Sequence, residues 1–234
     1  MKYPEPLIKA RIIKRYKRFL ADVELEDKTV ITVHCPNSGS MKTCWEEGWD
    51  VRISDSKNPK RKLQYTLEMT HNGSCWICVN TQIPNKIALE AITDKRIPGL
   101  EDYDTIRTEV KYGKNSRIDL LTEKDGRKTF IEVKNVTLLG DDGNYQFPDG
   151  VSARGLKHLN ELIDQVKDGQ RSVMLYVINR SDGSIFKAAK DIDPDYSEGL
   201  QRAYAAGVEV ICCQSRVSPE EIELTGQLID FEIE

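Results

Sequence analysis

The chain has 234 residues and a mass of 26.7 kDa, which is enough for one large domain or two small ones. With 39% apolar and 31% charged residues it has the composition of an ordinary globular protein, which argues against a disordered chain. No apolar run approaches the roughly 20 residues that a membrane-spanning helix needs, and residues 1–9 are no secretory signal, so we expect no membrane partner. Six cysteines without an export signal favour a cytoplasmic location, where they remain thiols.

The charge of the chain is unevenly distributed. Residues 1–82 carry 14 Lys and Arg against 10 Asp and Glu, a net charge of +4, whereas residues 83–234 carry a net charge of −8. This asymmetry suggests that the two parts have different partners. The overall charge of −4 does not exclude nucleic acid, because a local basic patch can supply the phosphate contacts.

Residues 1–82 show the alternation of apolar and polar side chains that is typical of short strands. About five such stretches are present, at residues 19–25, 31–34, 51–53, 63–70 and 75–79. Short strands in this number favour a small closed barrel of the OB-fold type, since closure removes unpaired strand edges, and a small sandwich is the alternative. We therefore expect residues 1–82 to form an OB-fold-like nucleic-acid-binding barrel.

From about Pro84 the pattern changes to alternating strands and helices. Helices are expected over 85–91, 156–166 and 197–206, and strands over 108–112, 117–121, 129–136, 172–178 and 208–213. Nearly continuous apolar strands between helices indicate a sheet covered on both faces, so residues 83–234 are expected to form an α/β domain. The strand-like residues after Gly207 argue against a second recognition helix, which disfavours sequence-specific repression by a helix-turn-helix.

The dipeptide Asp125-Gly126 separates two strand-like runs in this second domain. Asp-Gly is a strong hairpin signal because a type I′ turn needs positive φ at both central residues. In that turn, opposite residues have numbers that sum to 251, which places Asp119 directly opposite Glu132. The other face of the hairpin is expected to carry apolar side chains that pack together, namely Ile118, Leu120, Ile131 and Val133.

Two carboxylates directly opposite each other, with Cβ atoms roughly 5 Å apart, require a shared proton or a cation. Glu109, one strand earlier, adds a third carboxylate. Mg²⁺ or Mn²⁺ prefers such oxygen ligands, and Lys134, on the same face as Glu132, can orient an attacking water. This pattern suits phosphodiester hydrolysis, with Glu109, Asp119 and Glu132 as metal ligands. The alternative is a solvated hairpin in which Arg117 and Lys134 neutralise the two opposed carboxylates.

Two basic segments of the first domain are candidate nucleic-acid contacts. Residues 9–18 contain six Lys and Arg and no acidic residue, with Tyr16 and Phe19 interleaved, which suits phosphate contacts combined with base stacking. The alternative is a lysine-rich edge strand that is protected from aggregation. Residues 57–62 form a second basic loop, for which an ordinary solvated loop is the alternative. The candidate contacts are Lys14, Arg15, Tyr16, Lys17, Arg18, Lys60, Arg61 and Lys62.

Two smaller features are also candidates. If a helix begins near Ser152, Arg154 and His158 share one face, where they can contact DNA phosphate or lie over the metal site, and a solvent-exposed helix face is the alternative. The turn Asn37-Ser38-Gly39 can offer backbone N–H groups to a phosphate, and a purely structural turn is the alternative.

Several segments resemble the sugar fermentation stimulation protein A family. They are Tyr16 to Val23, His34 to Met41, Cys78 to Thr81, Glu109 to Gly113, Ser116 to Asp119, Ile131 to Lys134, Phe147 to Asp149, and Arg154-Gly155 with Lys157-His158-Leu159. The resemblance spans nearly the whole chain. It implies an N-terminal OB-like barrel, a C-terminal domain of the PD-(D/E)XK nuclease type, DNA binding without sequence specificity, and regulation of sugar, especially maltose, metabolism. Glu109, Asp119, Glu132 and Lys134 match the acidic and basic set of such nucleases.

These observations predict a two-domain nucleic-acid-binding protein with a Mg²⁺ or Mn²⁺ site of nuclease type. Non-specific DNA binding with a role in sugar metabolism is the expected function, and active cleavage of DNA or RNA is the alternative. The sequence leaves open whether RNA is bound and whether the chain forms a homodimer.

Overall fold

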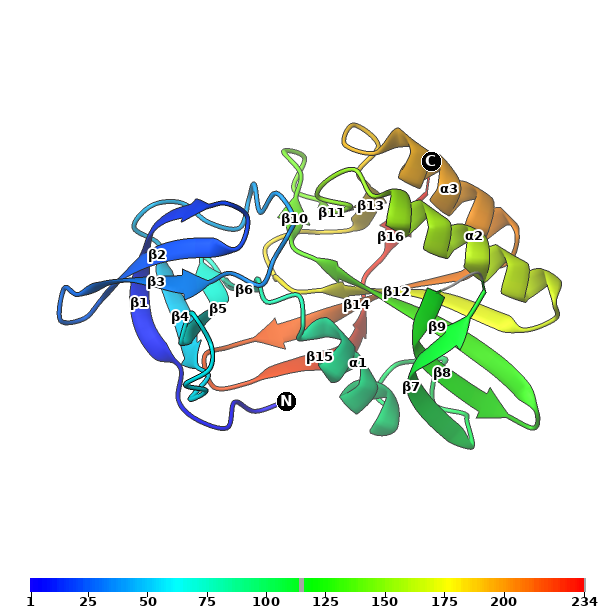
Figure 1. Cartoon of the computed structure of the whole chain (residues 1–234). Coiled ribbons are helices and arrows are strands. Elements are labelled where there is room, and N and C mark those ends of the chain that lie inside the picture. Colours follow the sequence, from blue (N-terminus) through cyan, green and yellow to red (C-terminus); the bar gives the residue numbers. More distant parts are fainter. Residues whose placement is uncertain (114–115, 234) are drawn as a thin grey trace.

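The computed structural model describes residues 1–113 and 116–233 and shows two bodies side by side, a barrel and a larger α/β domain (Figure 1). The barrel contains the first six strands, and every helix among the described residues belongs to the second body. None of the described helices is both long and apolar enough to cross a bilayer. The two expected parts, a closed barrel and an α/β domain, are both present in the described structure.

The barrel is a strongly curved sheet with strand order β3-β2-β1-β4-β5-β6, closed by a pairing between β3 and β5. Its strands are β1 (Ile8–Tyr16), β2 (Leu20–Leu25), β3 (Val30–His34), β4 (Asp50–Asp55), β5 (Tyr65–His71) and β6 (Trp76–Cys78). Alternate side chains such as Ala21, Val23 and Val33 point inward and are fully buried, which is the physical origin of the observed alternation.

The strand β1 was not expected from the sequence. It pairs with β2 on one side and β4 on the other, so the basic segment is not an edge strand. Ala10 and Ile12 are buried in the barrel, but the register shifts between Ile12 and Lys14, and this bulge breaks the two-residue period. Because the bulge interrupts the alternation of apolar and polar side chains, the charged residues are the more evident feature of this segment in the sequence.

The second body is a sheet with order β15-β14-β12-β9-β8-β7 in which β9, β12 and β14 are parallel. The helix α1 covers one face, and α2 and α3 lie together on the other (Figure 1). The strands are β7 (Thr105–Tyr112), β8 (Ser116–Lys124), β9 (Arg127–Val136), β12 (Arg171–Ile178), β14 (Glu209–Val217) and β15 (Ile222–Leu228). The helices are α1 (Pro84–Thr93), α2 (Ala153–Lys167) and α3 (Pro194–Ala205).

The α/β domain also contains a small second sheet, part of which lies near the barrel (Figure 1). Its strands are β10 (Leu138–Leu139), β11 (Tyr145–Phe147), β13 (Phe186–Ala188) and β16 (Phe231–Glu232), in the order β10-β11-β13-β16. The sequence did not predict it, because strands of two or three residues carry no periodicity. It places the segment after β11 next to the barrel, where it forms part of a cleft.

The hairpin of β8 and β9 has the expected register. Leu120 lies opposite Ile131, and both Asp125 and Gly126 have positive φ, as a type I′ turn requires. The expectation that Ile118 and Leu120 share a face was wrong, since Ile118 packs under α2 and Leu120 packs under α1. The pairing of β7 and β8 is interrupted between Leu120 and Ile118, opposite Glu109, which has a φ of +53°.

A buried arginine at the carboxyl end of β12 fixes the two bodies to each other. Arg180, only 2% exposed, donates hydrogen bonds to the backbone oxygens of Thr43 in the barrel and Thr137 in the α/β domain. It also forms an ion pair with Asp182 at 2.7 Å, and Asp182 accepts a hydrogen bond from Asn72 of the barrel. Burial opposes the charge of Asp182, but the hydrogen bonds and charge of Arg180 lower its pKa to about 2.

We expect Arg180→Leu to lower the free energy of unfolding by about 3 kcal/mol at pH 7, because the carboxylate and two carbonyl oxygens lose their donor. Asp182 stabilises the folded wild type above its ordinary pKa, and this contribution is lost as the pH falls toward 2, so the difference between the proteins should narrow over that interval. Urea denaturation at pH 7 and pH 3 measures both. Arg216→Leu, which removes an exposed cation, is the control and should change stability by less than about 0.5 kcal/mol.

Candidate functional site

Asp119 lies where the backbone pairing of β8 and β9 ends, and there its side chain accepts a hydrogen bond from a backbone N–H of β9. Its Oδ2 accepts a hydrogen bond from the backbone N–H of Val133 at 2.8 Å, and its Oδ1 accepts one from Asn85 Nδ2 at 2.8 Å. Asn85 lies in the first turn of α1. The carboxylate is therefore held by β9 on one side and by α1 on the other.

Glu132 is the most deeply buried acidic side chain of the site, with 2% of its surface exposed. Its Oε1 accepts hydrogen bonds from Lys134 Nζ at 2.7 Å and from His158 Nδ1. Its Oε2 is also buried but has no hydrogen-bond partner among the described residues. A buried carboxylate oxygen without a donor is costly, and it marks a position where a cation or a bound water would be stabilised.

The two carboxylates influence each other strongly. Burial and the negative charge of Glu132 raise the pKa of Asp119 to about 6, against the opposing hydrogen bond from Val133. Burial also acts to raise the pKa of Glu132, but the hydrogen bond from His158 and the charge of Lys134 outweigh it and lower that pKa. In the metal-free protein near pH 6, Glu132 thus stays ionised, whereas Asp119 titrates between its protonated and ionised forms.

His158 is oriented from the helix α2, which begins where the sequence indicated. Ser152 caps the helix by accepting a hydrogen bond from Gly155 N–H, which is 2.9 Å from its Oγ. Arg154 Nε donates to His158 Nε2 at 3.3 Å, so Nε2 is the acceptor and the proton resides on Nδ1, which donates to Glu132. The expected pair of Arg154 and His158 therefore shares a face, and that face lies against the carboxylates.

Glu109 occupies a different position from the other two carboxylates. It is exposed and lines a cavity of about 380 Å³ together with Arg154 and His158. No group of three or more His, Cys, Asp or Glu side chains among residues 1–113 and 116–233 is arranged to hold a metal ion. A role of Glu109 as a third ligand stays a prediction. Of the neutralising contacts expected in the alternative, Lys134 pairs with Glu132 on its own strand rather than with Asp119 across the hairpin, and Arg117 forms no ion pair with either carboxylate in the described structure.

Two residues beside the carboxylates, Asn85 and Tyr112, were not predicted from the sequence. Asn85 holds Asp119, but a single amide at the start of a helix carries no signal of its own. Tyr112 is electrostatically coupled to Glu132 and Asp119, and burial, with their charges, raises its pKa. Its buried hydroxyl has no hydrogen-bond partner in the described part of the chain. Tyr112 lies only three residues after Glu109, and that proximity was the available clue.

The predicted nucleic-acid contacts of β1 divide into two groups. Lys14 forms an ion pair with Asp22 at 3.3 Å, and Tyr16 donates a hydrogen bond to the same carboxylate at 3.0 Å. Arg15 donates from its guanidinium to the backbone oxygens of residues 37, 39 and 40, so its charge supports the loop. Lys17 and Arg18 are exposed in the turn that follows, and among the described residues neither forms an ion pair.

The second basic loop lies close to that turn. Arg61 donates two hydrogen bonds to Thr66 Oγ1 at 3.1 Å and its Nη2 is 3.5 Å from His34 Nδ1. The ring of His34 in turn stacks on Phe19 with centroids 6.5 Å apart, and Phe19 is 47% exposed. The barrel thus presents an exposed aromatic ring between two groups of cations, the latter being Lys17, Arg18, Lys60 and Lys62.

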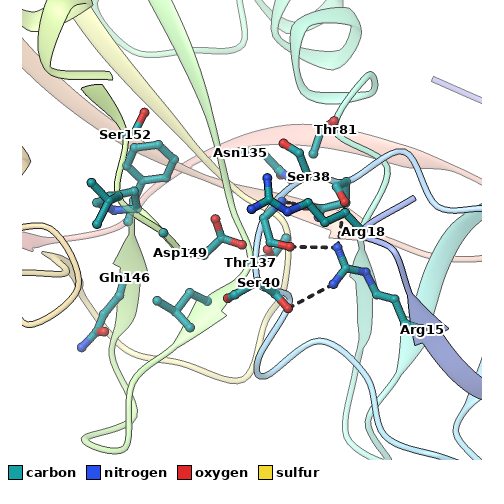
Figure 2. A pocket seen from close by; sticks show the side chains of 17 residues that line it. Arg15, Arg18, Ser38, Ser40, Thr81, Asn135, Thr137, Gln146, Asp149 and Ser152 are labelled. Carbon is teal, nitrogen blue, oxygen red and sulfur yellow. Dashed lines mark hydrogen bonds between the residues drawn. The ribbon is translucent and has the colours of Figure 1, made fainter. Parts of the chain in front are cut away.

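A cleft of about 700 Å³ separates the barrel from the α/β domain and is lined by residues of both. Figure 2 shows Arg18 reaching from the barrel side toward Ser38 and Asn135 and Arg15 hydrogen-bonded to the loop at Ser40, with Gln146 and Ser152 on the opposite side. The loop Asn37-Ser38-Gly39 forms part of the barrel wall. Asp149 of the α/β domain packs so closely on Gly39 that a Cβ atom there would overlap its carboxylate, and its Oδ2 accepts a hydrogen bond from Met41 N–H at 3.4 Å.

Comparison with known proteins places both domains. Residues 13–79 match the family model described as the SfsA N-terminal OB domain, and residues 82–221 match the one described as the sugar fermentation stimulation protein RE domain. The chain is 49% identical over 221 residues to the sugar fermentation stimulation protein homolog of Acidithiobacillus ferrooxidans, covering 94% of this chain and 95% of the relative. The homolog of Geobacter sulfurreducens is 49% identical over 225 residues and covers 96% of both chains.

A solved structure resembles the whole molecule. The SfsA protein of Pyrococcus furiosus, described as being in complex with Ca²⁺, superimposes with a TM-score of 0.89 and 26% sequence identity. The match covers 100% of this chain and 98% of the other, so barrel and α/β domain are both included.

We expect Asp119→Asn to make the metal-free protein more stable at pH 8, by about 2 kcal/mol. The raised pKa of Asp119 means that the folded state binds this proton more tightly than the unfolded state. Wild-type stability is therefore lost as the pH rises from about 4 to 6, and an uncharged amide removes this loss. The amide still accepts from Val133, and Asn85 can turn its own oxygen toward it. Urea denaturation in EDTA at pH 4 and pH 8 tests this, and equal stability of the two proteins at pH 8 contradicts it.

Proposed function

We propose that this chain, which belongs to the sugar fermentation stimulation protein family, binds nucleic acid without sequence specificity through its barrel and hydrolyses phosphodiester bonds at a divalent-cation site beside Asp119 and Glu132. The observation that carries the proposal is the buried Oε2 of Glu132, which has no partner among the described residues and lies next to a second carboxylate whose pKa is raised. A cation satisfies both oxygens at once.

The donor set fits Mg²⁺ or Mn²⁺. Mg²⁺ is usually held by one or two carboxylates, retained waters and substrate phosphate oxygens, so Asp119 and Glu132 are sufficient protein ligands. The Pyrococcus furiosus relative is described in complex with Ca²⁺, another cation that takes oxygen ligands. A divalent cation at this place supplies Lewis-acid activation of water and neutralises charge on the phosphate.

The remaining residues of the site have roles that follow from their contacts. Lys134 sits 2.7 Å from Glu132 with its side chain only 13% exposed, so its charge acts at short range and stabilises negative charge that develops on the phosphate. His158 holds the Glu132 carboxylate in one orientation and leaves Oε2 available for the cation. Arg154 fixes the tautomer of His158 and is therefore a positioning residue.

The surface of the barrel supports a grip on the polynucleotide backbone. Lys17 and Arg18 are exposed and form no ion pair in the described structure, and Phe19, which follows them and stacks on His34, offers an aromatic face. Cations with an exposed aromatic ring are the combination by which OB-fold barrels bind single-stranded nucleic acid, because stacking tolerates any base. Such contacts read no base edges, which accounts for binding without sequence specificity.

A second candidate function is that of a DNA-binding regulator that retains the nuclease fold without cleaving. The observation that favours it is that the described residues form no group of three metal-binding side chains. The name of the curated relatives connects the family with sugar fermentation. We infer that a role in sugar, including maltose, metabolism would be exerted through nucleic-acid binding, with or without hydrolysis.

Purified wild-type protein is expected to cleave labelled DNA in the presence of Mg²⁺ or Mn²⁺ and to leave it intact in EDTA. Asp119→Asn should cleave at least about 100-fold more slowly, since one of the two cation ligands loses its charge. Because this variant is expected to be at least as stable as the wild type, loss of cleavage cannot be attributed to unfolding.

Glu123→Gln, which alters a carboxylate near the other end of β8 that pairs with Arg107, is the matched control and should cleave at the wild-type rate. If the wild type binds single- and double-stranded DNA but leaves both intact with either cation, the proposal of hydrolysis is wrong. The second candidate, a DNA-binding regulator that does not cleave, is then the function that remains.

Replacing Lys17 and Arg18 together by alanine is expected to weaken DNA binding about 10-fold at 100 mM salt and to reduce the slope of log affinity against log salt by about 2, because two phosphate contacts are lost. Fluorescence anisotropy in EDTA measures both. Arg11→Ala removes an exposed cation of β1, the strand before this turn, that is paired with Asp50, and it should have little effect. Equal losses in the two proteins would show that the turn makes no specific contribution.

A further inference from the structure

The cleft between the two domains has a mixed lining. Its volume of about 700 Å³ lies in the range of cavities that hold drug-sized ligands. The barrel contributes polar side chains such as Ser38 and Ser40, and the α/β domain contributes Asn135 together with Phe147 and Val151. Val151 is 82% exposed, so its side chain is accessible to a ligand in the cleft. A ligand that fits this lining has both an apolar face and groups that form hydrogen bonds.

The charge in the cleft favours an anion on the barrel side. Arg15 is engaged by the loop carbonyl oxygens, whereas Arg18 lines the cleft without a hydrogen bond or ion pair to any described residue. The opposing Asp149 is directed against Gly39 and the backbone of Met41. The guanidinium of Arg18 is thus a positive charge in the cleft with which a ligand can pair, and phosphate is its preferred partner.

The position of the cleft connects the two parts of the proposed function. On the barrel side, Arg18 directly precedes Phe19, which stacks on His34. On the domain side, Asn135 of the cleft follows Lys134 on β9, and Ser152 caps the helix that carries His158. The residues that line the cleft are therefore direct chain neighbours of both the aromatic and cationic surface of the barrel and the carboxylate site.

The walls of the cleft are fixed by contacts between the domains. Gly39 and Asp149 meet without space for one more carbon atom, and Arg180 joins Thr43 of the barrel to Thr137. The volume of about 700 Å³ is too small to admit a duplex, whose major groove alone is about 12 Å wide, so a duplex could contact only the rim of the cleft. An unpaired nucleotide offers an apolar base and a phosphate in a unit small enough to enter.

We propose that the interdomain cleft holds an unpaired segment of single-stranded nucleic acid on its way from the barrel to the carboxylate pair, so that the substrate of the site is a single strand. This inference rests on the proposed function. It adds a binding site for one nucleotide and its phosphate, with Arg18 contacting the phosphate and Phe147 and Val151 contacting the base.

Protection of an introduced thiol tests the path of the strand. All six cysteines are free and five are buried, so Cys75→Ser removes the remaining partly exposed thiol. Val151→Cys in this background reports on the cleft. Val30→Cys, 56% exposed at the end of β3 remote from His34, is the matched control. The rate of maleimide labelling is measured in EDTA with a saturating 20-residue oligothymidylate, with a blunt duplex of equal length, or with thymidine monophosphate, and anisotropy under the same conditions reports binding.

We expect the oligothymidylate to slow labelling at Val151→Cys at least fivefold, while the duplex and the mononucleotide slow it less than twofold and Val30→Cys reacts at the same rate throughout. Three results would overturn the inference: bound oligothymidylate without protection at Val151→Cys, equal protection by duplex, or equal protection by the mononucleotide, which would indicate a small-molecule pocket. These results leave the proposed function intact. Absence of any binding of DNA by anisotropy would instead refute the proposed function, and this inference with it.

Discussion

Glu132 is a negative charge buried inside a protein beside a second carboxylate, and the α/β domain supplies the groups that make this arrangement tolerable. The helix on each face of the sheet contributes one of them, since α1 supplies Asn85 to Asp119 and α2 supplies His158 to Glu132. Lys134, on the same strand, supplies the compensating charge. One carboxylate oxygen is still left without a donor among the described residues. The two helices are therefore needed to stabilise the buried carboxylates, and the oxygen that they leave without a donor is where a cation would complete that stabilisation.

Features that depend on local sequence were predictable. The register of the hairpin follows from two residues, Asp125 and Gly126, because the turn alone fixes which positions face each other. The start of α2 at Ser152 is likewise a matter of one capping side chain. The irregularity at Glu109 was not predictable, because a positive φ is uncommon for glutamate and nothing in the local sequence indicates one. The same applies to β1, whose bulge hides its alternation.

Charge in the sequence was a poor guide to charge on the surface. Of the basic and aromatic residues of β1, Lys14 and Tyr16 converge on Asp22, and Arg15 is used to hold a loop 22 to 25 residues away. Such roles are invisible to a single sequence, since the acceptors are backbone oxygens or an acid on a neighbouring strand. Lys17 and Arg18 lie in an exposed turn with positive φ, and neither forms an ion pair with another described residue.

The contact between Gly39 and Asp149 is one of the points at which the barrel meets the α/β domain. A methyl group on residue 39 would overlap the Asp149 carboxylate, so this side chain would have to turn away or the domains would have to separate. Turning away would cost Asp149 the hydrogen bond that it accepts from Met41 N–H. The missing side chain on residue 39 thus permits this close approach, and a substitution there should reshape the wall of the cleft.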